Sequence, residues 1–219
     1  MRLSYSGPSI HLTVRGLGCQ RGGRVLFSGL DLDLAPGDLV TLTGANGSGK
    51  STLMRMLSGL SPVEEGNIAF SGGGEQDAAH TFLHYHGHRE GLRDALTAHE
   101  NLVFATTLLG GRAEDAGPAL ERMGARRLAN LPVRVLSAGQ RRRVALARLL
   151  AAPRPLWLLD EPLAALDVAG QALVAELVGE HVAAGGSALV ATHQPMNITG
   201  RTLTLGGAGF GGAGSERGR

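Results

Sequence analysis

The stretch of sequence that decides the fold is GANGSGKST at Gly44–Thr52, whose spacing is GxxxxGK[ST]. It follows a β-branched run that predicts a strand at residues 39–43, and it opens a helical pattern at residues 50–58. Glycines between a strand and a helix let main-chain N–H groups turn inward around a phosphate, and the helix N-terminus adds partial positive charge. The candidate nucleotide-binding residues are Gly44, Ala45, Asn46, Gly47, Ser48, Gly49, Lys50, Ser51 and Thr52.

Lys50 and Ser51 carry the chemistry that we expect of this loop. Lys50 is the only lysine in a chain of 219 residues whose other basic side chains are arginines. An ammonium is a compact point charge and a guanidinium is a planar fork, so we expect Lys50 to reach the β- and γ-phosphates of ATP in a catalytic role. The Ser51 hydroxyl is expected to bind Mg²⁺. A chance glycine-rich turn is the alternative interpretation.

A second candidate element is Leu156–Glu161, an apolar strand that ends in two acids. Ligands of open α/β sheets collect at the carboxyl ends of the strands, so both acids are expected beside the glycine-rich loop. Asp160 is predicted to hold Mg²⁺, directly or through water, and Glu161 is predicted to polarise the attacking water. Taken alone, such a pair could equally be a turn or a helix cap.

The rest of the chain alternates between strand and helix patterns. Strands are predicted at residues 9–14, 30–34, 39–43, 67–71, 81–86, 155–160 and 187–192, and helices at 50–58, 98–109, 114–124, 138–151 and 168–183. Alternation of this kind predicts an α/β fold with a mostly parallel central sheet. Because no strand interrupts the middle helices, we expect an inserted helical subdomain at about residues 94–152. The domain is predicted to span residues 9–205, and the glycine-rich residues 206–219 are predicted to be disordered.

Composition excludes several classes of function. The formal net charge of +2 is too small to argue for a nucleic-acid partner, and none is expected. The single cysteine, Cys19, excludes an intramolecular disulfide and a multi-cysteine zinc site, and is expected in the core. No apolar run is long enough for a membrane helix and no signal-peptide pattern opens the chain, so we expect it in the cytoplasm, with membrane contact through a partner.

A third motif is LSAGQ at Leu136–Gln140, followed by RRRVALAR. Ser137 and Gln140 have the spacing of a capping box, and Gly139 allows close main-chain approach, so the helix start is a second candidate anion site. The motif resembles the signature sequence of ABC ATPases. In that family it binds the γ-phosphate of ATP held by the opposite subunit, which implies a homodimer with shared sites. A plain helix cap is the alternative, and Arg141–Arg143 are interpreted as a solvated helix face.

Other positions follow or depart from the ABC pattern. The resemblance implies an antiparallel β subdomain near the N-terminus, a D-loop at Leu163–Asp167 that links the two sites, and a switch histidine at His193 that contacts the γ-phosphate. His88 occupies the place of a glutamine whose side-chain oxygen usually contacts the metal. A neutral imidazole also has a ring nitrogen with a free lone pair, so the same role is expected of His88. Arg21 occupies the usual adenine-stacking position, where a guanidinium can also stack.

Several less specific segments resemble one family among the ABC ATPases. The segments concerned are CQRGGRVLF at Cys19–Phe27, YHGHREGL at Tyr85–Leu92, LTAHENL at Leu96–Leu102, PLWLLDEPLAALD at Pro155–Asp167 and ATHQP at Ala191–Pro195. They are similar to the ATP-binding subunits of bacterial cytochrome c maturation systems. That resemblance implies a haem-transporting ATPase, peripheral on the cytoplasmic face of the inner membrane, with integral-membrane partner subunits.

Three alternatives remain open from the sequence. An ABC ATPase for another cargo, such as a drug, lipid or lipoprotein, would keep the same catalytic residues. A non-transport ABC protein that acts on DNA or ribosomes usually has two cassettes or a coiled-coil insertion, and this chain has neither. His84, His86 and His88 alternate and could share one face of a strand as a metal or haem site, although two polar strand residues and a loop histidine account for them equally well.

Overall fold

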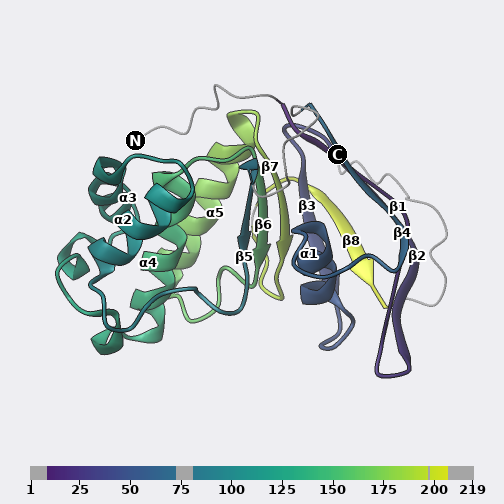
Figure 1. The fold of residues 1–219 in the computed structure, drawn as a ribbon, viewed down its shortest axis with the longest axis horizontal. Helices are drawn as coiled ribbons and strands as arrows, with labels where there is room; N and C mark the ends of the chain where they lie inside the picture. Colours follow the sequence, from purple (N-terminus) through teal and green to yellow (C-terminus); the bar gives the residue numbers. More distant parts are fainter. Residues whose placement is uncertain (1–8, 73–80, 197, 207–219) are drawn as a thin grey trace.

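The computed structural model describes residues 9–72, 81–196 and 198–206 and shows two sheets with helices packed against the larger one (Figure 1). Residues 207–219 of the tail predicted to be disordered lie outside the described residues, so that prediction is untested. Within the described part of the chain, no helix is long and apolar enough to cross a membrane.

The central sheet is parallel throughout, which confirms the predicted fold class. Its strands are β3 (Leu39–Gly44), β5 (Leu83–His86), β6 (Leu156–Asp160), β7 (Ser187–Ala191) and β8 (Arg201–Leu205), in the order β5-β6-β7-β3-β8. Every residue of β6 and β7 is buried, as expected of strands covered on both faces. β8 was not predicted from the sequence; it is an edge strand with mostly exposed residues.

A smaller antiparallel sheet has the order β2-β1-β4, with β1 at His11–Arg21, β2 at Arg24–Leu34 and β4 at Glu65–Ser71. β1 and β2 are longer than predicted and form one hairpin around Gly22 and Gly23, whose φ values are 57° and 78°. Two consecutive residues of positive φ match the right-handed twist of the strands. Register shifts along β1 interrupt the period-two pattern that the sequence interpretation relied on.

The helices form a separate group in Figure 1, except for α1. They are α1 (Lys50–Leu57), α2 (Ala98–Leu108), α3 (Ala116–Arg122), α4 (Ala138–Ala151) and α5 (Val168–Ala183), with 3-10 turns at Ala113–Asp115, Arg126–Leu128 and Val133–Val135. α2 and α4 both start with capping boxes, Thr97 with Glu100 and Ser137 with Gln140. The capping box predicted at Ser137 is therefore confirmed.

Two hydrophobic cores lie on opposite faces of the central sheet. On β6, Trp157 and Leu159 join the core under α2–α5, whereas Leu156 and Leu158 join the core that includes α1 and the antiparallel sheet. Trp157 stacks on His181 of α5, with ring centroids 3.8 Å apart. The buried Cys19 belongs to the second core, as predicted. This alternation fixes which face of β6 each side chain occupies. Because the sheet is parallel, the acidic carboxyl end of β6 lies at the same edge as the end of β3, with β7 between them.

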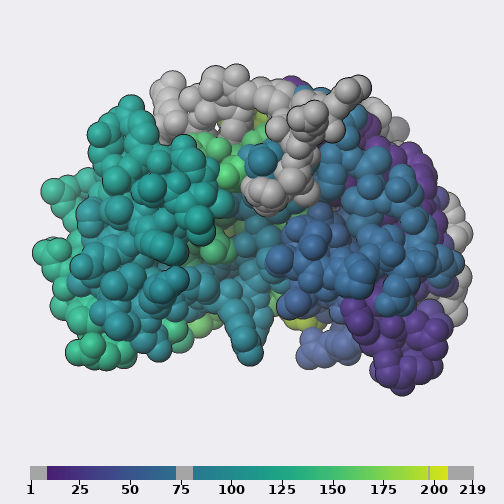
Figure 2. Space-filling view, in the orientation of Figure 1, coloured from purple at the N-terminus to yellow at the C-terminus, as the bar shows by residue number. Residues whose placement is uncertain are grey.

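The space-filling view shows two lobes with a hollow between them (Figure 2). One lobe carries the helices α2–α4, drawn in teal and green, and the other carries α1 and the antiparallel strands, drawn in blue and purple. The central sheet lies between the hydrophobic cores of these two lobes.

Candidate active site

The glycine-rich loop joins β3 directly to α1 and is shaped by two glycines. A Cβ on Gly44 (φ 142°) would lie 2.5 Å from the main-chain oxygen of Leu205, and a Cβ on Gly49 (φ 100°) would lie 3.1 Å from the ring of Phe27. Gly49 is the N-cap of α1 and supplies no side-chain hydrogen bond to it. The start of α1 therefore has no side-chain cap that would compete with a bound phosphate.

Lys50 is held inside this loop. Its Nζ donates to the main-chain oxygens of Gly44 at 2.7 Å and Ala45 at 3.1 Å, and the residue is only 8% exposed. The ammonium is thus already fixed beside the position where the loop would hold a phosphate. When a phosphate binds, Lys50 would exchange its main-chain acceptors for phosphate oxygens without a large movement of its side chain.

The acidic end of β6 faces the same loop. Asp160 is 3% exposed, and the main-chain N–H of Glu161 donates to the oxygen of Ala191 at 2.8 Å. Glu161 has a φ of 51°, which is unusual for a residue with a side chain, and its Oε1 lies 3.5 Å from Nε2 of His193. The turn after β6 therefore aims the Glu161 carboxylate at His193, in the loop after β7.

One cavity of about 250 Å³ collects these groups. It is lined by Leu26, Asn46, Gly47, Gly49, Lys50, Ser51, Thr52, Asp160, Glu161 and His193. The Ser51 hydroxyl and the Asp160 carboxylate are oxygen donors of the kind that Mg²⁺ prefers, and they line the same cavity as the phosphate loop, so the donor set fits this ion. Leu26 was not predicted; a leucine in an apolar strand carries no signal for a ligand.

Of the other predicted site residues, Gly44, Ala45 and Ser48 belong to the phosphate loop but do not line the cavity, whereas Arg21 and His88 lie outside both. Arg21 is exposed at the end of β1, where it pairs with Arg24 across the hairpin turn, and His88 is exposed in the loop after β5. Neither is held in place by burial. Their predicted contacts, with adenine and with the metal, remain proposals.

The signature residues form a separate surface at the start of α4. The main-chain N–H of Gln140 donates to Ser137 Oγ at 3.3 Å, and Gln140 Oε1 accepts from the N–H of Ser137 at 2.9 Å. A Cβ on Gly139 would lie 2.6 Å from the main-chain oxygen of Ala165, which has a φ of 62°. The loop after the acidic pair therefore packs directly on this helix start, and only glycine fits there.

The alternating histidines have structural contacts. His84 Nε2 lies 2.7 Å from the oxygen of Ala152, and burial, followed by the charge of Arg148, lowers the pKa of His84 to about 3. His86 is fully buried and also contacts arginines. Over residues 9–72, 81–196 and 198–206, no three His, Cys, Asp or Glu side chains are grouped to hold a metal. The alternative of a three-histidine site gains no support.

One prediction about arginine was wrong. The run Arg141–Arg143 was interpreted as a solvated face, but Arg142 is only 4% exposed and points into the protein. The other two are partly exposed and form ion pairs: Arg141 with Glu90 and Asp94, and Arg143 with Asp167. Burial of Arg142 results from tertiary contacts, which a one-dimensional pattern does not contain.

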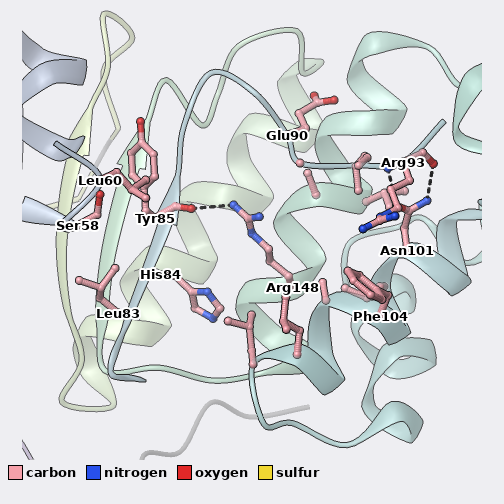
Figure 3. A pocket seen from close by; sticks show the side chains of 18 residues that line it. Ser58, Leu60, Leu83, His84, Tyr85, Glu90, Arg93, Asn101, Phe104 and Arg148 are labelled. Atoms are coloured by element: carbon pink, nitrogen blue, oxygen red, sulfur yellow. Dashed lines mark hydrogen bonds between the residues drawn. The ribbon is translucent and has the colours of Figure 1, made fainter. Parts of the chain in front are cut away.

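A larger cavity of about 320 Å³ lies between β5, the loop that follows it, α2 and α4. Figure 3 shows Arg148 reaching across it from α4 to the main-chain oxygen of Tyr85, a contact of 2.8 Å. Asn101 of α2 joins the loop to this cavity wall, since it accepts from the N–H of Arg93 and donates to the oxygen of Arg93. The exposed apolar side chains Phe104 and Leu108 line the same cavity.

The family profile described as ABC transporter matches residues 27–164. The cytochrome c biogenesis ATP-binding export proteins CcmA of Nitrobacter winogradskyi and Rhodopseudomonas palustris (strain BisB18) are 48% and 49% identical over 199 residues, which is 91% of this chain and 100% of each relative. An ABC transporter ATP-binding protein of Pyrococcus furiosus has the same fold, with a TM-score of 0.78 at 21% identity over 89% of this chain and 97% of that one. The chain therefore belongs to the ATP-binding subunits of ABC transporters, in the family of the cytochrome c biogenesis ATP-binding export proteins.

Proposed function

We propose that this ABC ATPase drives the haem-export step of c-type cytochrome biogenesis, as a peripheral subunit on the cytoplasmic face of the inner membrane. The observation that carries ATP hydrolysis is the single cavity that joins Lys50, Asp160, Glu161 and His193. A role in export during cytochrome c biogenesis is supported by the names of relatives that share nearly half of their residues with this chain over their full length, and haem is the cargo that we infer from that role. An ABC ATPase for another cargo is the alternative, and it would use the same cavity.

The residues of the cavity divide the work of hydrolysis. Lys50 would bind the β- and γ-phosphates, and Glu161 would accept the hydrogen bond of the attacking water and polarise it. His193, 3.5 Å from Glu161, would contact the γ-phosphate and orient the carboxylate. Mg²⁺, held by Ser51 and Asp160, would neutralise phosphate charge when bound. His88 would reach the ion only after its loop moves inward, since it lies outside the cavity lining.

The second candidate anion site, at the start of α4, supports a proposal that two copies act together. Ser137, Gly139 and Gln140 do not line the cavity that contains the chain's own phosphate loop. We propose that they bind the nucleotide of a second copy, so that the complete site forms only in a homodimer.

We propose that an integral-membrane subunit binds at the larger cavity. Phe104 and Leu108 are 48% and 75% exposed, and together with Leu60 they make an apolar rim beside the loop that carries His88. Exposed apolar groups in such a cluster are typical of protein interfaces. A segment of the membrane subunit that fills this cavity would touch the loop that we expect to respond to nucleotide.

The variant Leu108→Glu tests both the cavity and the cargo. A tagged chain isolated from its native membranes is expected to retain an integral-membrane subunit of cytochrome c maturation. Leu108→Glu should lower that recovery at least about tenfold, because a carboxylate would be desolvated in the interface. ATP affinity should not change. Val63→Glu, at an exposed apolar residue that does not line this cavity, is the control and should bind the subunit normally. Recovery of a drug or lipid exporter instead would support the alternative cargo.

A second variant tests the adenine contact. Arg21→Ala should weaken ATP binding by up to about tenfold, the loss of ~1 kcal/mol of stacking, and Arg21→Tyr should restore it. Titration calorimetry with ATP measures the affinity. Arg24→Ala, across the hairpin from Arg21, is the matched control and should bind ATP as the unchanged protein does. Equal affinity of Arg21→Ala and the unchanged protein would show that adenine binds elsewhere on this surface, with Leu26 the nearest candidate.

A further inference from the structure

Arg142 joins the signature helix to the acidic end of β6. It lies on α4 and is almost fully buried, although it follows the predicted anion site by only a few residues. Its Nη2 donates to the main-chain oxygen of Glu161 at 3.0 Å, and its Nη1 donates to Nε2 of His86 at 2.8 Å. One guanidinium thus connects α4, β5 and the turn after β6.

The main chain of Glu161 requires such support. A φ of 51° places this residue in the left-handed region, which residues with a Cβ rarely adopt. Three hydrogen bonds hold it there: its N–H donates to Ala191, and its oxygen accepts from the N–H of Ala164 at 3.1 Å and from Arg142. Of these three contacts, only that of Arg142 comes from a side chain.

His86 fixes the direction of the Arg142 guanidinium. A guanidinium can only donate, so Nη1 of Arg142 donates and Nε2 of His86 accepts. Arg148 contacts the other side of His86, with its Nη2 3.4 Å from Nδ1, and is itself bound to the main chain of Tyr85. The His86 ring, which projects from β5, is therefore held between Arg142 and Arg148 of α4.

We propose that Arg142 is a positioning residue for ATP hydrolysis, which holds the Glu161 main chain so that the Glu161 carboxylate is aimed into the phosphate cavity. This inference rests on the proposed catalytic role of Glu161. It also gives α4 a direct connection from the anion site at its start to the glutamate of the same chain. The buried positive charge of Arg142 further offsets the negative charges of Asp160 and Glu161 in that cavity.

The variant Arg142→Met removes both hydrogen bonds and keeps an unbranched side chain. We expect kcat for ATP to fall about ten- to a hundredfold, because small displacements of a catalytic group cost rate steeply, while KM stays within about twofold. Arg154→Met is the matched control. Arg154 is also a buried arginine that donates to a main-chain oxygen, that of Leu109 at 2.7 Å, but it lies in the loop before the amino end of β6, whereas Glu161 follows the carboxyl end of that strand. Its loss should lower thermal stability without lowering kcat.

Two variants of His86 separate positioning from folding. His86→Gln keeps an acceptor for Arg142 and should retain most of the turnover, whereas His86→Leu removes it and should lower kcat with little change in KM. Thermal melts of all variants give the stability change. The proposal is overturned if Arg142→Met turns over ATP normally, if Arg154→Met lowers kcat as much, or if His86→Gln and His86→Leu behave alike.

The same measurements distinguish failure of this proposal from failure of the proposed function. If Glu161→Gln loses turnover and Arg142→Met does not, only the positioning role is wrong. If Glu161→Gln keeps normal turnover, the catalytic role of Glu161 is wrong, and the positioning role fails with it. In single-turnover experiments, adding Arg142→Met to Glu161→Gln should cause little further loss, since Arg142 would act through Glu161.

Discussion

Glu161→Gln is expected to lower ATP turnover by a factor of about 10² to 10⁴ while ATP affinity stays close to that of the unchanged protein. The amide has the shape of the carboxylate but cannot polarise water as a base. Lys50 and the phosphate loop remain intact, so the nucleotide should still bind. Steady-state phosphate release measures turnover, and calorimetry measures affinity.

A dimer trapped by ATP is the second result that we expect of Glu161→Gln. If ATP closes two copies together and hydrolysis reopens them, Glu161→Gln with ATP should elute as a dimer in size-exclusion chromatography. Glu176→Gln is the control: this glutamate lies exposed on α5 and pairs with Arg122, away from the cavity. Normal hydrolysis by Glu161→Gln would remove Glu161 from the catalytic role.

Gly139→Asp is expected to abolish hydrolysis while ATP still binds to the monomer. A side chain at this position meets the main-chain oxygen of Ala165 at the β-carbon, and a carboxylate adds repulsion toward the γ-phosphate of the second copy. Gly139→Ala separates the two causes, since it brings the steric contact without the charge. The steric part alone should already lower turnover, and the difference between the two variants measures the electrostatic part.

Mixing the two inactive variants tests the shared site. In a dimer of one Gly139→Asp and one Glu161→Gln subunit, one composite site carries both changes and the other carries neither. Activity should partly return in the mixture if the sites can act singly. Hydrolysis by Gly139→Asp alone at the normal rate would contradict the composite site.

The central sheet and the residues of the candidate active site could be predicted because their signals are local. β6 is a continuous apolar run followed by two acids, and the glycine spacing before Lys50 has few other uses. The two strands of the long hairpin were predicted too short because glycines and register shifts break their alternation, and β8 was missed because it is short and mostly exposed. These failures follow from the period-two rule itself, which needs one buried face.

The surroundings of Glu161 could not be predicted for a different reason. Arg142 stands in a run of three arginines, and nothing in that run distinguishes the buried one. Its burial depends on His86, which is 56 residues away in the sequence. Arg21 and His88 show the opposite case. Their roles were predicted from their positions relative to the motifs, but both residues are exposed and no packing fixes their side chains.

The stack of Trp157 on His181 gives the protein an internal optical probe. Trp157 is the only tryptophan in the chain and is fully buried, three residues before Asp160. Its emission therefore reports from a single place, the junction between β6 and α5, rather than as an average over the molecule. A red shift on heating would mark the moment when water reaches the strand that carries the acidic pair, and the melts of the variants above can be followed by that one signal.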